Sequence, residues 1–176
     1  MPFIAARPLI LALLAIWVTL MARSDAAVPP SLKGQLLIAT DSMRDSRFDH
    51  AVILMVRHDI DGAMGIVINR PLGERPLAEL LAAFGTKDTP ASGNVRIFLG
   101  GPVQPEVSFA IHGADYGRPE TQSLIAFGYA GWAPGQLEGE LARNVWYTAP
   151  ADPALVFDDD RDKVWEHATA RRTQDL

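Results

Sequence analysis

Two dense runs of apolar residues, 51–56 and 64–68, flank a short polar segment and dominate the hydrophobic pattern of the chain. Both runs have the length of a strand and contain many β-branched residues, which favour strands. Asp61-Gly62 lies between them and tolerates the positive φ that a tight reversal needs. The pattern therefore predicts a β-hairpin over 51–69. Because neither run alternates apolar with polar residues, both faces should be covered, which places the hairpin at the centre of a sheet.

The rest of the chain supplies the elements that would surround this hairpin. Strands are expected at 34–40, 95–99, 107–112, 123–128 and 144–148, and helices at 77–84, 134–141 and 161–172. Pro76 and Pro134 are placed to begin two of the helices, and Asp160 is placed to cap the third. Residues 69–73 are expected to form a loop. Strands arranged around hairpins, with three or four helices, predict one α+β domain whose sheet is mostly antiparallel.

The N-terminal residues have the pattern of an export signal. Arg7 precedes the uncharged run of fifteen residues from Pro8 to Ala22. This run is shorter than the ~20 residues of a membrane span but typical of a signal-peptide core. Small residues at 24, 26 and 27 then resemble a cleavage site. We expect residues 1–27 to be a signal peptide or, if uncleaved, an N-terminal anchor, with 28–33 as a linker and 34–176 as the folded domain.

Cleavage would give an exported, periplasmic protein, and retention of the segment would give one anchored in the inner membrane. The alternative is a misassigned start, because Met21 and Met43 lie downstream, and the protein would then be cytoplasmic. Membrane contact is expected only through the uncleaved N-terminal segment.

Charge and cysteine content exclude several functions. The formal net charge is −5 and the sequence has no block of Lys and Arg, so direct nucleic-acid binding is not expected. The chain has no cysteine, which excludes disulfides, zinc–thiolate sites, thiol catalysis and a lipid-modified cysteine anchor.

Candidate catalytic groups do not assemble from the sequence. There is no Gly-x-Ser-x-Gly motif, and Ser108 and His112 would lie ~13 Å apart along one strand face, far beyond the ~3 Å that a nucleophile and its base require. His58, Asp59 and Asp61 are close in sequence and could serve as acid/base groups or metal ligands of a small hydrolase. Hairpin tips favour aspartate for turn chemistry, however, and this is the preferred explanation of the two aspartates.

Two segments carry residue types suited to ligand binding. The glycine-rich stretch 128–136 precedes an expected helix, where backbone N–H groups can contact an anion, with Trp132 as a wall. Arg70 can bind a carboxylate or phosphate through two hydrogen bonds, or it can fix its own Asn-Arg-Pro loop.

Several motifs taken in order are similar to those of one bacterial family. They are Gly34-Gln35-Leu36-Leu37-Ile38-Ala39, Asp45-Ser46-Arg47-Phe48, His58-Asp59, Gly62 to Leu72, Leu99-Gly100-Gly101-Pro102-Val103, Phe109-Ala110-Ile111-His112 and Gly128 to Glu138, followed by Asn144-Val145-Trp146. Across 34–165 the chain resembles the AlgH/YqgE family. The resemblance implies a compact α+β domain with a curved sheet. The family is largely uncharacterised, with no catalytic residues or cofactor to carry over, and its name is tied to a proposed role in transcriptional regulation.

The chain departs from the family pattern in two places. Most relatives lack an export signal, and a regulator outside the cytoplasm could not meet DNA. The family pattern also places another strand and helix in the region that here holds only residues 113–123. Loss of that unit would leave a sheet edge or an apolar face uncovered. A rearranged domain, a homodimer that covers the gap and a poorly folded variant are the alternatives.

We therefore expect a non-enzymatic binding or regulatory module without cofactor, metal or catalytic residue. Its partner would be a protein or a small anionic ligand, contacted by loops at strand ends. The residues expected to make these contacts are Asp41, Arg47, His58, Asp59, Asn69, Arg70, Gly100, Gly101 and Trp132. The small hydrolase is the alternative, and a cytoplasmic DNA-binding protein ranks third.

Overall fold

A computed structural model describes residues 30–83, 85, 92–113 and 123–173. Its strands are β1 (Gln35–Ala39), β2 (Val52–Asp59), β3 (Gly62–Val67), β4 (Pro71–Pro76), β5 (Asn94–Leu99), β6 (Val103–His112), β7 (Ser123–Trp132) and β8 (Trp146–Pro150). The helices are the 3-10 turn η1 (Ser46–Phe48), α1 (Leu77–Ala83), α2 (Gln136–Ala142), α3 (Pro153–Val156) and α4 (Val164–Ala170). The predicted α+β class with a mostly antiparallel sheet is confirmed.

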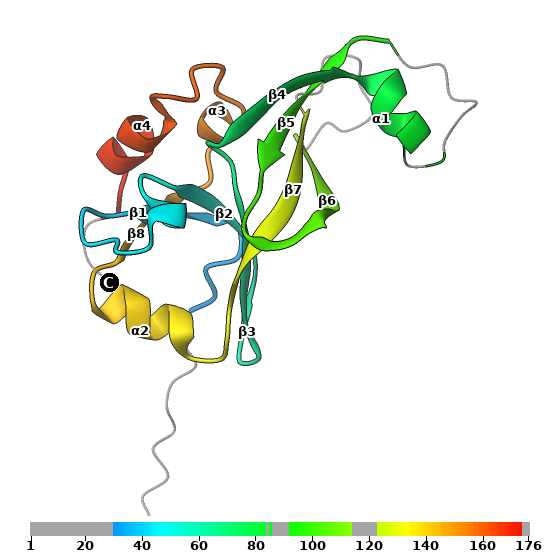
Figure 1. The fold of residues 1–176 in the computed structure, drawn as a ribbon. Coiled ribbons are helices and arrows are strands. Elements are labelled where there is room, and N and C mark those ends of the chain that lie inside the picture. The colour runs from blue at the N-terminus through cyan, green and yellow to red at the C-terminus, as the bar shows by residue number, and fades with distance from the viewer. Residues whose placement is uncertain (1–29, 84, 86–91, 114–122, 174–176) are drawn as a thin grey trace, which may run out of the picture.

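The eight strands form one sheet, in which seven follow the order β4-β5-β7-β3-β2-β1-β8 and β6 pairs with β7 beside this path. Every pairing is antiparallel except that of β5 with β7. We call β1, β2, β3, β8 and α2 to α4 the body, and β4, β5, β6, the first half of β7 and α1 the arm. Figure 1 shows the arm extending to one side of the body, with β7 as the strand that joins them.

The predicted central hairpin is formed by β2 and β3, which lie in the middle of the strand path. The chain reverses at Gly62, whose φ is +123°. One face of the hairpin, including Val52 and Ile66, packs under α3 and α4. The other face, including Ile53 and Val67, packs toward Leu137 of α2. Both faces are therefore covered, as the absence of polar alternation predicted.

The end of β5 fits between β3 and β7 because it carries glycine. Gly100 donates its N–H to the carbonyl of Phe127 at 2.7 Å and accepts from the N–H of Val67 at 2.8 Å. A Cβ atom at this position would lie 2.3 Å from the carbonyl oxygen of Gly128. Body and arm thus meet at a point where no side chain fits.

Several boundary predictions were wrong for identifiable reasons. Residues 71–76 form strand β4 rather than a loop followed by a helix start at Pro76, because prolines are tolerated at the ends of an edge strand. This strand is exposed throughout, so it carries no hydrophobic alternation. Helix α2 begins at Gln136 rather than Pro134, because Gly135 adopts a left-handed conformation with φ of +74°.

The last helix begins at Val164, and the predicted cap by Asp160 does not form. Asp160 instead accepts from the ammonium of Lys163 at 2.7 Å. The predicted signal segment and most of the shortened 113–123 region lie outside the described residues. Among the helices that the structure does describe, none is long and apolar enough to cross a membrane.

Candidate functional site

A pocket of about 400 Å³ opens on the body beside α2. Four separate segments line it: the loop that contains η1, the residues after β5, the end of β7 with α2, and the start of β8. The lining residues are Ser42, Met43, Arg44, Asp45, Arg47, Phe48, Pro102, Val103, Gly131, Trp132, Gln136, Glu140, Arg143, Val145 and Trp146. We call this cavity the aromatic pocket.

Three aromatic rings form its wall. Trp132 ends β7 and Trp146 begins β8, and their ring centroids lie 6.0 Å apart in an edge-to-face arrangement. Phe48 of η1 meets Trp146 in the same way at 5.9 Å. Such geometry is the one that aromatic pairs prefer. Both tryptophans are buried, at 7% and 4% exposure, so most of each ring packs against the protein itself.

Glu140 of α2 fixes the two tryptophan rings. Its Oε2 accepts from the indole N–H of Trp132 at 2.8 Å and from that of Trp146 at 2.7 Å. Its Oε1 accepts from the side-chain amide of Gln136 at 2.9 Å. Hydrogen bonds to a carboxylate are stronger than those between neutral groups. This one side chain therefore ties α2 to the ends of two strands.

Cationic side chains stand at the rim of the pocket. Arg47 makes an ion pair with Asp45 at 2.6 Å, and its side-chain hydrogen bonds hold the pKa of that carboxyl below its usual value. Arg44 and Arg143 are exposed. Neither guanidinium has a hydrogen-bond or ion-pair partner among the described residues. Within the described residues, the rim thus carries positive charge without an acidic partner.

His58 is buried behind α2, with 5% of its side chain exposed. Its Nδ1 accepts from the N–H of Leu32 at 3.0 Å, so the ring proton is on Nε2, which lies 2.8 Å from the carboxylate of Glu138. The pKa of Glu138 lies below its usual value, first because its own backbone N–H bonds the carboxylate and then because His58 does. Through these two contacts, His58 of β2 connects Leu32, which precedes β1, with Glu138 of α2.

The predicted contact residues do not form one cluster. Arg47 and Trp132 line the aromatic pocket, and Gly100 and Gly101 immediately precede its residues Pro102 and Val103. Asp41 is exposed in the loop after β1, outside the pocket lining.

The other two predicted loops make local contacts. The amide of Asn69 accepts from the N–H of Val52 at 2.9 Å and donates to the carbonyl of His50 at 2.8 Å. Arg70 donates to the carbonyl of Asp49. These bonds fix the chain between β3 and β4 against the loop before β2.

The three residues of the alternative hydrolase site are not brought together. The ring of His58 faces Glu138 inside the body, whereas Asp59 is exposed at the hairpin tip and accepts from the N–H of Asp61 at 2.9 Å. In the described parts of the chain, no three His, Asp or Glu side chains are arranged to hold a metal ion. The hydrolase alternative receives no support.

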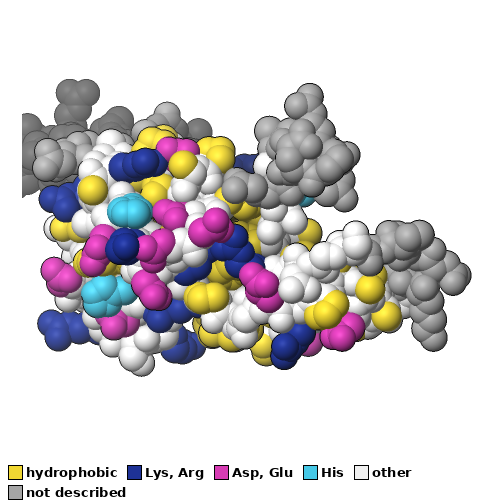
Figure 2. Space-filling view, turned by 90° about the horizontal axis from the view of Figure 1, so that it is seen from above, with side chains coloured by type: hydrophobic (Ala, Val, Ile, Leu, Met, Phe, Trp, Pro, Cys, Tyr) yellow, Lys and Arg dark blue, Asp and Glu magenta, His cyan; other side chains and the backbone are white. Residues whose placement is uncertain are grey.

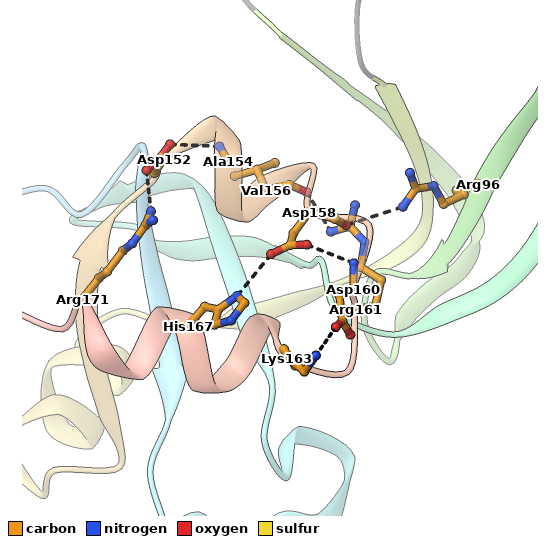
Figure 3. Close-up of polar contacts among 10 residues, drawn as sticks. All are labelled: Arg96, Asp152, Ala154, Val156, Asp158, Asp160, Arg161, Lys163, His167 and Arg171. Carbon is orange, nitrogen blue, oxygen red and sulfur yellow. Dashed lines mark hydrogen bonds and ion pairs between the residues drawn. The ribbon is translucent and has the colours of Figure 1, made fainter.

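A second polar cluster lies at the opposite end of the body, over α3 and α4 (Figure 2). Asp158 accepts from the N–H of Asp160 at 2.9 Å and lies 3.2 Å from Nδ1 of His167 (Figure 3). Beneath this turn, buried Arg161 donates to the carbonyl of Val156 at 2.8 Å and stacks over the ring of Phe98 at 4.8 Å. Burial lowers the pKa of Arg161 to about 10. These contacts hold the C-terminal segment against the sheet.

Sequence reasoning missed Glu140, Arg143 and Trp146 as site residues. A usable signal existed, because Gln136 and Glu140 are four residues apart on one helix face and follow Trp132 closely. Nothing local indicates that Trp146 joins them.

Comparison with known proteins decides the family. The DUF179 model, described as AlgH-like, matches residues 36–118 and 114–176. The chain belongs to the AlgH-like family. It is 40% identical over 161 residues to a UPF0301 protein of Methylococcus capsulatus, and the match covers 77% of this chain and 88% of the relative.

Solved structures agree with this assignment. The solution structure of the AlgH protein from Pseudomonas aeruginosa superposes with a TM-score of 0.62 at 36% identity, covering 81% of this chain and 89% of that one. The crystal structure of protein DIP2367 from Corynebacterium diphtheriae has a TM-score of 0.60 at 21% identity, covers 81% and 87% of the two chains, and shows the fold alone.

The AlgH-like chain is shortened relative to its relatives. The alignment with the Methylococcus protein spans 161 positions but uses 77% of 176 residues, about 136, so that relative carries about 25 residues which this chain lacks. The family model matches in two stretches, which overlap at residues 114–118.

Proposed function

We propose that this AlgH-like protein is a non-enzymatic binding module whose aromatic pocket takes a small acidic ligand with a flat apolar body. The observation that carries the proposal is the combination of two fixed indole rings with two unpaired guanidinium groups at the rim. The conclusion concerns recognition, and any regulatory role would depend on the bound ligand.

The charges around the pocket favour an anion. Arg47 already has its carboxylate partner in Asp45, and Glu140 is occupied by three hydrogen-bond donors. Arg44 and Arg143 are the lining cations that remain free within the described structure. A guanidinium binds a carboxylate or phosphate through paired hydrogen bonds. The ligand would therefore present its acidic group to these two arginines.

The wall of the pocket favours a flat apolar body. Ligand sites bury most of a small molecule against hydrophobic and aromatic side chains, with a few polar groups that set its orientation. Met43, Phe48 and Val103 join the tryptophans in the lining, and Val103 is 36% exposed although it is apolar. An aromatic acid would bury this surface.

Binding rather than catalysis is proposed because the carboxylates here already have partners. Glu140 is occupied by its three donors and Glu138 by His58. A general base needs a free acceptor within about 3 Å of the proton it removes. Glu138 is not among the residues that line the pocket, and Glu140 already accepts three hydrogen bonds.

A titration with 2-naphthoate tests the proposal, with uncharged 2-naphthalenemethanol as the matched control ligand. Calorimetry should detect saturable binding of the acid and at least about tenfold weaker binding of the alcohol. The double variant Arg44→Gln/Arg143→Gln should weaken naphthoate binding, while Arg171→Gln, just after α4 and outside the pocket lining, should not. Equal binding of acid and alcohol, no saturable binding of the acid, or insensitivity to the double variant would overturn the proposal.

We also propose that the module is exported to the periplasm by its N-terminal segment. The support is the uncharged run from Pro8 to Ala22 followed by small residues. Mass spectrometry of protein purified from fractionated cells should find a start near Ala27 or Val28 in the periplasmic fraction. An intact Met1 in cytosolic protein would refute export.

A further inference from the structure

The segment that precedes β1 is held against the end of β2 by a single histidine. The hydroxyl of Ser31 donates to the backbone carbonyl of His58 at 2.8 Å, and the N–H of Leu32 donates to Nδ1 of its ring at 3.0 Å. The side chain of Leu32 is buried and packs in a core cluster with Leu137 of α2. We call residues 30–33 the N-terminal strap.

The hydrogen bond from Leu32 to the ring requires a neutral imidazole. A backbone N–H can only donate, so Nδ1 of His58 accepts with its lone pair and the single ring proton lies on Nε2. Nε2 donates this proton to Oε1 of Glu138 at 2.8 Å. A second proton would bind Nδ1 and turn two N–H donors toward each other. The N-terminal strap is therefore held by one protonation state of one side chain.

The surroundings of the ring act on the second proton in opposite directions. Among the described residues, Glu138 of α2 is the acidic side chain in contact with the ring, and its charge favours the imidazolium. Arg57 and Asp59, on either side along β2, are exposed and lie 3.8 Å from each other. Lys33 of the strap is exposed, and Ala63, the register partner on β3, carries no charge. Burial of the ring, whose side chain is 5% exposed, opposes the charged form while the strap is in place.

We propose that His58 is a pH-sensitive latch, which holds the N-terminal strap at neutral pH and releases it when the ring takes up a second proton in mild acid. Histidine is the side chain whose charge ordinarily changes between about pH 5 and 8. Release of the strap lets water accept from the new Nδ1–H while Glu138 still accepts from Nε2–H, so both donors of the imidazolium are satisfied. The latch residues Leu32, His58 and Glu138 lie outside the lining of the aromatic pocket.

Hydrogen exchange followed by NMR on the purified, ¹⁵N-labelled protein tests the latch, with the protection factor of the Leu32 amide as the readout. The protection factor is corrected for the intrinsic pH dependence of exchange, so it reports local opening. We expect it to fall at least about tenfold from about pH 7.5 to about pH 5.5, the change that follows when opening frees one histidine to take up a proton. The amide of Val67, which donates to the carbonyl of Gly100, should change by less than about twofold.

Three variants separate protonation of the ring from its packing. In His58→Asn, the amide oxygen takes the place of Nδ1 as acceptor but does not titrate, so protection of the Leu32 amide should no longer depend on pH. His167→Asn, at a half-exposed histidine of α4, should keep the native pH dependence. Glu138→Gln should keep the latch but move its release to lower pH, because a neutral amide does not favour the imidazolium.

The ¹⁵N chemical shifts of the His58 ring provide a second measurement, which needs no variant. At neutral pH they should place the ring proton on Nε2, and the second proton should appear over the same pH range in which the Leu32 amide loses protection. A proton on Nδ1 at neutral pH, protection of Leu32 that does not change with pH, or an undiminished pH dependence in His58→Asn would overturn the proposal.

Discussion

Trp132 and Trp146 share one hydrogen-bond acceptor, because both indole N–H groups donate to Oε2 of Glu140, at 2.8 and 2.7 Å. The two rings come from β7 and β8, which are separated by β3, β2 and β1 in the strand order, and they meet at Glu140 of helix α2. This arrangement makes the aromatic pocket a structural unit before any ligand arrives. Its behaviour on mutation can therefore be tested without knowing the ligand.

The first prediction concerns this shared carboxylate. Glu140→Gln keeps the size of the side chain, but its amide cannot accept from Gln136 and from both indoles together. One donor loses its partner, and we expect the free energy of unfolding to fall by about 1–3 kcal/mol. Urea denaturation followed by circular dichroism measures this. Glu106→Gln, at an exposed position of β6, should change stability by less than about 0.5 kcal/mol, and equal losses in the two variants would contradict the argument.

The second prediction concerns pH. The folded-state pKa of Glu138 lies below its ordinary value of 4.5, so the folded state binds this proton less readily than the unfolded chain. The stabilisation is fully present above pH 4.5 and is lost as pH falls through the lowered pKa. We expect the difference in unfolding free energy between the native chain and Glu138→Gln to shrink on acidification below pH 4.5. A difference that stays constant from neutral to acidic pH would show that the pair is not linked to folding.

The third prediction concerns the crossing of β5 between β3 and β7. In Gly100→Ala, the new Cβ would lie 2.3 Å from a backbone oxygen that cannot move independently. We expect a loss of about 3 kcal/mol in unfolding free energy. Gly139→Ala is the control, because its Cβ would lie 3.5 Å from the guanidinium of Arg143 inside a helix. That variant should gain up to about 1 kcal/mol, and a similar loss at both positions would reject the packing explanation.

The fourth prediction concerns the buried guanidinium beneath the α3–α4 turn. Arg161→Lys keeps the charge but cannot reproduce the planar stacking on Phe98 together with the hydrogen bond to Val156. We expect a loss of about 1–2 kcal/mol, measured by thermal or urea unfolding. Arg171→Lys, which retains an exposed ion pair with Asp152, should change stability by less than about 0.5 kcal/mol. Equal effects would mean that the burial of Arg161 does not matter.

Local residue patterns predicted the hairpin and the family but not all of the remaining elements. The two runs that form β2 and β3 are apolar because both faces of the hairpin are buried. Their burial could therefore be predicted from the residue types alone. Strand β4 escaped prediction because all six residues are exposed and leave no hydrophobic period. The cap at Asp160 failed because that carboxylate bonds Lys163 instead, a choice between two local partners that composition does not settle.

Only part of the aromatic pocket was predicted from the sequence, at residues whose sequence neighbours suggested a binding role. Trp132, in a glycine-rich stretch, and Arg47, in a loop at a strand end, were both predicted as contact residues, and both line the pocket. Glu140 and Trp146 were not, because a glutamate on a helix and a tryptophan at a strand start have ordinary explanations. Asn69 and Arg70 were chosen for their chemistry, but they bond the backbone before β2.

The sequence by itself determined the central hairpin, the α+β class, the acidic charge and the resemblance to one family, because each depends on residues that are neighbours along the chain. Only the tertiary structure decided that β7 joins body and arm and that two indoles share one carboxylate. These features arise from contacts between segments far apart in sequence, and such contacts depend on how the strands pair rather than on any local pattern.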